Sequence, residues 1–84
     1  MHVELLGIPR ERAGVAEVHL EAGTLGQLLV ALAARFPAFN DLIAADRLQP
    51  SITANLNGDR FISDPRTELR TGDSVLILSA DAGG

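Results

Sequence analysis

The last six residues, 79–84, read SADAGG and directly follow the apolar run VLIL. Glycine lacks a Cβ atom and adopts positive φ readily, so the pair Gly83-Gly84 would let the backbone approach another active site closely. Six extended residues reach roughly 20 Å, enough to enter a slender channel in a partner. The chemistry indicated is that of the Gly84 carboxylate, presented to a partner by a folded domain behind it.

Other residue types with catalytic or metal-binding potential lie where the pattern gives them structural roles. His2 stands at a chain end and His19 on the polar face of a predicted strand, so both are interpreted as surface histidines. Asp59 and Asp64 stand in turn sequences, where aspartate is common. LNGD, residues 56–59, lacks the flanking pattern of a phosphate-binding loop. We therefore predict no metal site, no bound cofactor and no free-standing enzyme.

The composition excludes several functions. The sequence contains no cysteine, which removes a disulfide framework, a thiolate metal site and a thiol nucleophile. All seven basic residues are arginines, so no lysine of this chain can form a Schiff base or receive an isopeptide. The arginines are scattered among 11 acidic residues, which argues against nucleic acid as a partner. The net charge of -4 favours protein partners with basic surfaces.

Length and hydropathy predict one domain over residues 1–84. The chain is 46% apolar, enough for one small core and too short for two. The start, MHVELLG, lacks the basic leader and apolar run of a signal peptide. The longest mostly apolar stretch, residues 25–36, is shorter than the ~18 residues needed to span a bilayer. We expect no membrane partner and a cytoplasmic location.

Hydrophobic periodicity predicts the elements in the first half of the chain. Residues 2–8 and 15–22 alternate as strands, and PRERAG between them indicates a hairpin loop. A helix is predicted over residues 24–36, because Thr24 and Gln27 form a capping box and a leucine-rich stripe follows at helical spacing. Residues 38–48 favour a brief second helix or a turn.

The second half of the chain indicates strands. Residues 51–62 form a hairpin around Asn57-Gly58, which suits a type I′ turn. The last strand is apolar at each position from Val75 to Leu78, as expected of a central strand covered on both faces. Hairpins at both ends with a helix between them place the first and last strands side by side and parallel. The predicted fold is an α+β β-grasp, or ubiquitin-like, mixed sheet with one main helix on one face and a free C-terminal tail, residues 79–84.

Strand parity predicts which residues face the core. Val3, Leu5, Val75 and Ile77 should line it, whereas Glu4, Glu17 and His19 should lie on the opposite, wetted face. Leu6, Leu76 and Leu78 share that wetted face just before the tail. Apolar clusters rimmed by polar groups commonly mark interaction sites, so these leucines, with Asp81 and Ala82 of the tail, are the predicted partner-binding residues.

The chain resembles the MoaD/ThiS sulfur carriers over nearly its whole length, through RERAG after the first strand, LNGD at 56–59, LRTGDSV at 69–75 and the final Gly83-Gly84. The resemblance implies that an ATP-using adenylating enzyme activates the Gly84 carboxylate and that a sulfurtransferase converts it to a thiocarboxylate. The chain would then be a protein co-substrate and not an enzyme, although it could count as the small subunit of a molybdopterin synthase, with the large subunit as acceptor.

Two other functions and several sulfur acceptors stay open. A ubiquitin-like modifier joined to target lysines through Gly84, or a β-grasp module that only binds, would fit the same fold. Molybdopterin-synthase small subunits commonly carry a proline pair where this chain has Ser79-Ala80, and many carry an apolar residue in place of Asp81. The acceptor could therefore be a molybdenum or tungsten cofactor precursor, thiamine thiazole, a tRNA, cysteine or a secondary metabolite.

Overall fold

The computed structural model describes residues 1–80. Its elements in chain order are β1 (His2–Leu6), α1 (Ile8–Ala13), β2 (Glu17–His19), α2 (Leu25–Arg35), the 3-10 helix η1 (Pro37–Phe39), β3 (Ile43–Ala44), β4 (Arg47–Leu48), β5 (Ile52–Leu56), β6 (Arg60–Ile62) and β7 (Ser74–Ser79). Five of the strands form one sheet in the order β2-β1-β7-β5-β6, and β3 pairs with β4.

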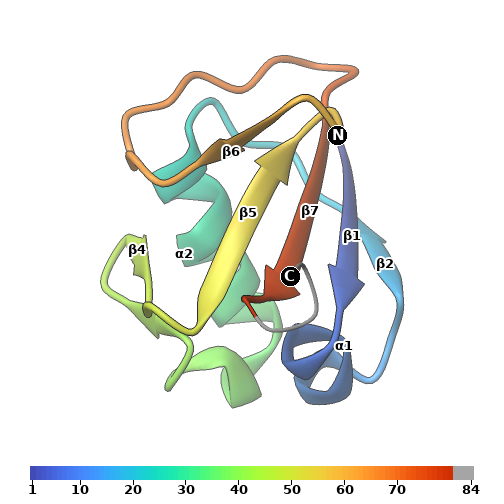
Figure 1. Ribbon diagram of the computed structural model, residues 1–84, viewed down its shortest axis with the longest axis vertical. Helices are drawn as coiled ribbons and strands as arrows, with labels where there is room; N and C mark the ends of the chain where they lie inside the picture. The colour runs from blue at the N-terminus through green and yellow to red at the C-terminus, as the bar shows by residue number, and fades with distance from the viewer. Residues whose placement is uncertain (81–84) are drawn as a thin grey trace.

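The last strand occupies the centre of the sheet (Figure 1). β7 pairs in parallel with β1, in a register that sets Val3 opposite Val75 and Leu5 opposite Ile77, and it pairs antiparallel with β5. β1 and β5 each carry a further antiparallel neighbour, β2 and β6. This is the predicted β-grasp arrangement, with the first and last strands parallel in the middle.

The main helix forms where its capping signal predicts. The Thr24 side chain accepts a hydrogen bond from the Gln27 amide, and the Gln27 side chain accepts one from the amide of Gly23. The helix ends at Arg35, because Pro37 disfavours helical geometry at Phe36. Along α2, Leu25, Leu28, Leu29 and Leu32 are fully buried.

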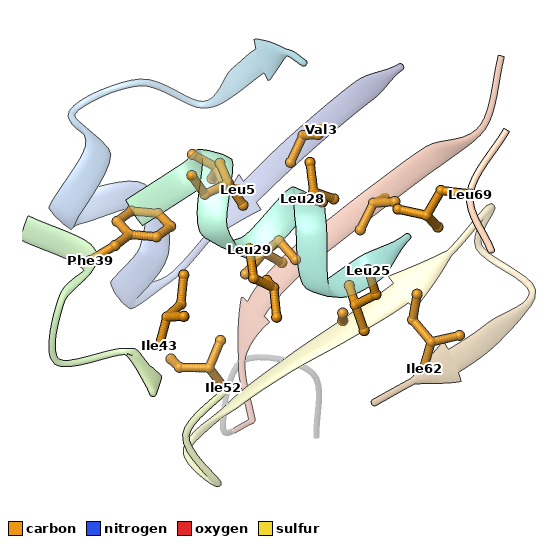
Figure 2. Close-up of a cluster of buried hydrophobic side chains, with 14 of the residues drawn as sticks. Val3, Leu5, Leu25, Leu28, Leu29, Phe39, Ile43, Ile52, Ile62 and Leu69 are labelled. Carbon is orange, nitrogen blue, oxygen red and sulfur yellow. The ribbon is translucent and has the colours of Figure 1, made fainter. Parts of the chain in front are cut away.

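The core fills the space between α2 and one face of the sheet (Figure 2). The four residues predicted from strand parity, Val3, Leu5, Val75 and Ile77, are all buried there. Glu4, Glu17 and His19 are exposed, as predicted for the opposite face. Both assignments of strand parity are therefore confirmed.

Three local expectations differ from the structure. PRERAG is helical within α1, since Pro9 stands near the start, where its missing N–H costs nothing, and Gly14 ends the helix at φ 76°. The second strand is shorter than residues 15–22. Residues 38–48, expected to form a brief helix or a turn, contain the end of the brief 3-10 helix η1 and also the unpredicted two-stranded sheet β3-β4.

The β5-β6 hairpin has the predicted turn. Asn57 and Gly58 adopt φ 57° and 68°, and the Leu56 carbonyl accepts a hydrogen bond from the Asp59 amide. Positive φ at both central residues is the requirement of a type I′ turn. Asp59 stays outside the ladder, which pairs Leu56 with Arg60 and so sets Asn55 beside Phe61.

Candidate functional site

The C-terminal segment begins later than expected. Residue 79 was predicted to start a tail, yet Ser79 is the last residue of β7 and pairs with Ile52. The Ala80 amide donates to the Ser51 carbonyl at 2.8 Å. Backbone pairing therefore continues through residue 80. The other predicted tail residues, Asp81, Ala82, Gly83 and Gly84, lie outside the described residues.

Helix α1 lies against the end of β7 and holds it through a side chain. The Ile8 amide, the first of the helix, donates to Ser79 Oγ at 2.7 Å. Gly7 precedes Ile8 at φ 71°, a backbone conformation that glycine adopts readily because it lacks a Cβ atom. Gly7 has no side chain that could cap the helix. Ser79 is only 7% exposed. A hydroxyl from the end of β7 thus satisfies a helix amide 71 positions earlier in the chain.

Helix α1 is in turn attached to η1. The Arg12 guanidinium donates to the Ala38 carbonyl at 3.0 Å and forms an ion pair with Asp41. The hydrogen bond from Arg12 lowers the pKa of the Asp41 carboxyl below its ordinary value. Pro9, between Ile8 and Arg12 in the sequence, is the buried residue of α1. The element that supports the end of β7 is therefore fixed at both of its own ends.

The sheet face away from α2 carries the predicted partner-binding leucines, and we call it the outer face. Its residues follow from register: Leu76 lies opposite Glu4 on one side and Asn55 on the other, and Asn55 lies opposite Phe61. Directly opposed residues point to the same side of a sheet. The next row across the sheet is formed by Leu6, Leu78 and Thr53.

The three predicted leucines differ in accessibility. Leu6 is 39% exposed and Leu76 is half-buried, whereas Leu78 is only 4% exposed. Leu78 was expected to be accessible with the others. It lies in the central strand with Leu6 on one side and Thr53 on the other, whereas Leu6 lies beyond the last residue of β1 that pairs with β2. Leu6 and Leu76 are therefore the accessible pair.

Two further residues of the outer face were not singled out from the sequence. Phe61 is 64% exposed at the edge of the sheet, and the buried Oδ1 of Asn55 has no hydrogen-bond partner in the described part of the chain. A hollow of about 140 Å³ opens beside Asn55, lined also by Glu4 and Leu76. The two-residue turn alone would not have predicted Phe61: it pairs Leu56 with Asp59, whereas the observed ladder pairs Leu56 with Arg60, and this shift by one residue sets Phe61 beside Asn55.

The residues set aside in the sequence have structural roles. His2 Nε2 lies 2.7 Å from Glu17 Oε2, which joins β1 to β2. Asp64 Oδ1 accepts from the Arg66 amide at 2.9 Å, as turn aspartates do. Within residues 1–80, no group of three or more His, Asp or Glu is arranged to hold a metal ion. In the same range, no helix has the length and hydropathy to cross a bilayer.

Comparison with known proteins decides the family. The model of the ThiS family matches residues 3–84, nearly the whole chain. The chain belongs to the ThiS family. This confirms the resemblance to the MoaD/ThiS carriers, and the chain is a small ubiquitin-like protein of the sulfur-carrier or modifier type. A search of the curated proteins gives no match.

Solved structures share the fold. Small archaeal modifier protein 1 (SAMP1) from Methanosarcina acetivorans is 27% identical, with 99% of this chain and 94% of that chain covered and a TM-score of 0.80. A chain of the BexX/CysO complex from Amycolatopsis orientalis is 24% identical, with coverage of 99% and 98% and a TM-score of 0.79. A putative molybdopterin converting factor, subunit 1, from Pyrococcus furiosus is 24% identical, with coverage of 93% and 93% and a TM-score of 0.73.

Proposed function

We propose that this ThiS-family chain is a sulfur carrier whose Gly84 carboxylate is adenylated and converted to a thiocarboxylate, with molybdopterin synthesis as the receiving pathway. The observation that carries the proposal is the family match, which extends to Gly84 as its last residue. The fold likeness to a putative molybdopterin converting factor subunit supports the choice of pathway.

The chemistry requires a partner enzyme. A carboxylate is a poor electrophile, so one of its oxygens must first attack the α-phosphorus of ATP, with pyrophosphate as the leaving group. The terminal sulfur of a persulfide on the sulfurtransferase then displaces AMP to give an acyl disulfide. A second thiol attacks the donor sulfur of this disulfide, forms a new disulfide with it and releases the thiocarboxylate. This chain supplies the carboxylate and a surface for docking, whereas the adenylating enzyme binds ATP and a sulfurtransferase supplies sulfur. The chain is thus a co-substrate.

The outer face is the proposed docking surface for the adenylating enzyme and the acceptor. Leu6, Leu76 and Phe61 provide accessible apolar area, and Glu4 provides charge beside it. The unpartnered Oδ1 of Asn55 can accept a hydrogen bond from a donor on the partner. Such a surface fits a partner that is apolar at its centre and basic at its rim. The BexX/CysO complex is an example of a structural relative bound to another protein.

A truncation tests the proposal. Deleting Gly83 and Gly84 should leave the melting temperature nearly unchanged, since the elements that build the core end at Ser79. The deletion should abolish adenylation, measured as ATP–pyrophosphate exchange with the cognate activating enzyme. Wild-type exchange by the truncated protein would refute the proposal. Intact mass after addition of a sulfur donor should show one oxygen replaced by sulfur in the full-length chain only.

A protein modifier is the second candidate, because SAMP1 from Methanosarcina acetivorans is 27% identical over almost the full chain. Both functions begin with the same adenylate and differ in the group that attacks it. A lysine amine would form a stable isopeptide, whereas sulfur forms a thiocarboxylate. Recovery from cells of lysine adducts ending in Gly84 would favour the modifier, and recovery of the free thiocarboxylate would favour the carrier.

A further inference from the structure

The root of the C-terminal segment, Ser79 and Ala80, is held to two separate parts of the molecule. Ser79 Oγ accepts from the Ile8 amide of α1 at 2.7 Å, and the Ala80 amide donates to the Ser51 carbonyl, which precedes β5, at 2.8 Å. Two consecutive residues are thus bonded on opposite sides of β7. Together the two bonds restrict the direction in which the chain leaves the sheet.

The hydroxyl of Ser79 has no equivalent substitute at this place. The Ile8 amide is one of the four at a helix start that lack a partner within the helix, and Gly7 cannot cap it with a side chain. The bond is partly buried, with Ser79 7% exposed, so loss of the oxygen would leave the Ile8 amide without this partner. Replacement of this one atom therefore loosens the contact between α1 and the last residue of β7.

Helix α1 is itself a firm support. Pro9 is buried, and at the far end of the helix Arg12 donates to the Ala38 carbonyl and pairs with Asp41. The helix therefore connects η1, which covers one end of the core, with the end of the central strand. A bond to such an element fixes position, whereas a bond to a mobile loop would not.

We propose that Ser79 is a positioning residue: through its bond to Ile8 it sets where the Gly84 carboxylate arrives in the site of the activating partner. This inference rests on the proposed function. Gly84 is the fourth residue after Ala80, and at no more than ~3.3–3.6 Å per residue the position and direction of Ala80 limit where the carboxylate can reach. Ser79→Ala should reduce the adenylation rate of the bound carrier, since a displacement of ~1 Å can cost on the order of a hundredfold.

The kinetic test separates positioning from docking and from stability. In single-turnover adenylation, Ser79→Ala should lower the maximal rate at least several-fold and leave the half-saturating carrier concentration unchanged, because the outer face is intact. Ser79→Thr keeps the hydroxyl and should restore the rate. The matched control is Gly14→Ala, which strains the other end of α1 at φ 76° without touching β7. A wild-type rate for Ser79→Ala, or equal slowing by Gly14→Ala, would overturn the proposal.

A second measurement does not depend on adenylation. The chain contains no cysteine, so Ala82→Cys can carry a single nitroxide label. In the wild-type background, paramagnetic broadening should concentrate on amides around Ile8 and Ser51, and Ser79→Ala should spread it over other residues. An unchanged broadening pattern would refute the anchoring role. The two tests can fail separately. If no partner adenylated the wild-type chain, the proposed function would fail, but the broadening pattern would still show whether Ser79 anchors the segment.

Discussion

The two ends of β7 are held in different ways. At its start, Asn57 binds the first residue and the one before it: its Oδ1 accepts from the Ser74 amide at 2.8 Å, and its Nδ2 donates to Asp73 Oδ1 at 3.1 Å. Asp73 also accepts from the Arg70 amide at 2.8 Å. At its end, the one side-chain bond that the described residues provide is that of Ser79 to α1.

The difference follows from what each end must do. The start is joined to the β5-β6 turn by exposed bonds from Asn57 to residues 16 and 17 positions later, and to the preceding turn by the bond between Arg70 and Asp73. Under the proposed function, the end presents a segment to another protein, and its side-chain support comes from α1, 71 positions earlier in the chain. We infer that changes at the start alter stability, whereas changes at the end alter reactivity.

The largest effect on stability is expected for a charge placed on the core face of β7. Ile77→Glu buries a carboxylate at a site that is 1% exposed, with no basic partner in the core. The cost of an unpaired buried charge is several kcal/mol, comparable with the total stability of ~5–15 kcal/mol of a small domain. The whole domain should therefore unfold, which would be seen as loss of the native circular dichroism spectrum.

The matched variant is Leu76→Glu, one residue away on the outer face. It should fold, since Leu76 is half-buried and faces away from the core. It should bind the activating partner at least tenfold more weakly, because burial of a leucine in an interface contributes roughly 1.5–3 kcal/mol. A folded Ile77→Glu variant together with an unfolded Leu76→Glu variant would mean that the two faces of β7 are exchanged.

Turns and helix caps were predictable from the sequence, whereas the bonds that hold the two ends of β7 were not. Asn57-Gly58 signals the turn between β5 and β6 within two residues, and Thr24 with Gln27 signals the start of α2 within four. By contrast, the bond between Ile8 and Ser79 joins residues 71 positions apart, and no local pattern indicates it. The same limit explains α1, whose six residues are too short for a periodic stripe, and the burial of Leu78, which depends on neighbours in two other strands.

Substitutions of Asn57 test the inference that the start of β7 controls stability. Asn57→Ala removes two side-chain bonds and places a Cβ-bearing residue without a polar side chain at φ 57°. The free energy of unfolding should fall by about 2–3 kcal/mol, from roughly 1 kcal/mol per lost bond and ~1 kcal/mol for the left-handed backbone. Urea unfolding measures this loss. Asn57→Gly removes the bonds without the backbone cost and should lose about 1–2 kcal/mol.

Neither Asn57 variant should slow adenylation when it is assayed where the protein is folded. Slowing equal to that of Ser79→Ala would show that both ends of β7 control the reactive segment. The distinction between stability at the start and reactivity at the end would then be wrong.

The smallest expected effects come from two surface carboxylates: Asp73, before the start of β7, and Asp41, which pairs with Arg12 of α1. Hydrogen bonds, chiefly from the Arg70 amide and next from the Asn57 side chain, lower the pKa of Asp73. A pKa that is lower in the folded state gives stability that is present above the unfolded-chain value, near 3.9, and is lost as pH falls through the folded value. Wild type should therefore be more stable than Asp73→Asn near neutral pH, and acidification below about pH 4 should shrink the difference.

Salt should distinguish Asp73 from Asp41. The pKa of Asp41 is lowered mainly by the Arg12 side chain, an exposed ion pair that added salt screens, whereas the first cause at Asp73 is a backbone amide. In urea unfolding near neutral pH, added sodium chloride should reduce the effect of Asp41→Asn more than that of Asp73→Asn. Equal salt dependence would mean that the Arg12–Asp41 pair contributes little beyond its hydrogen bond. The attachment of α1 to η1 would then rest chiefly on the Arg12 bond to the Ala38 carbonyl and on the buried Pro9.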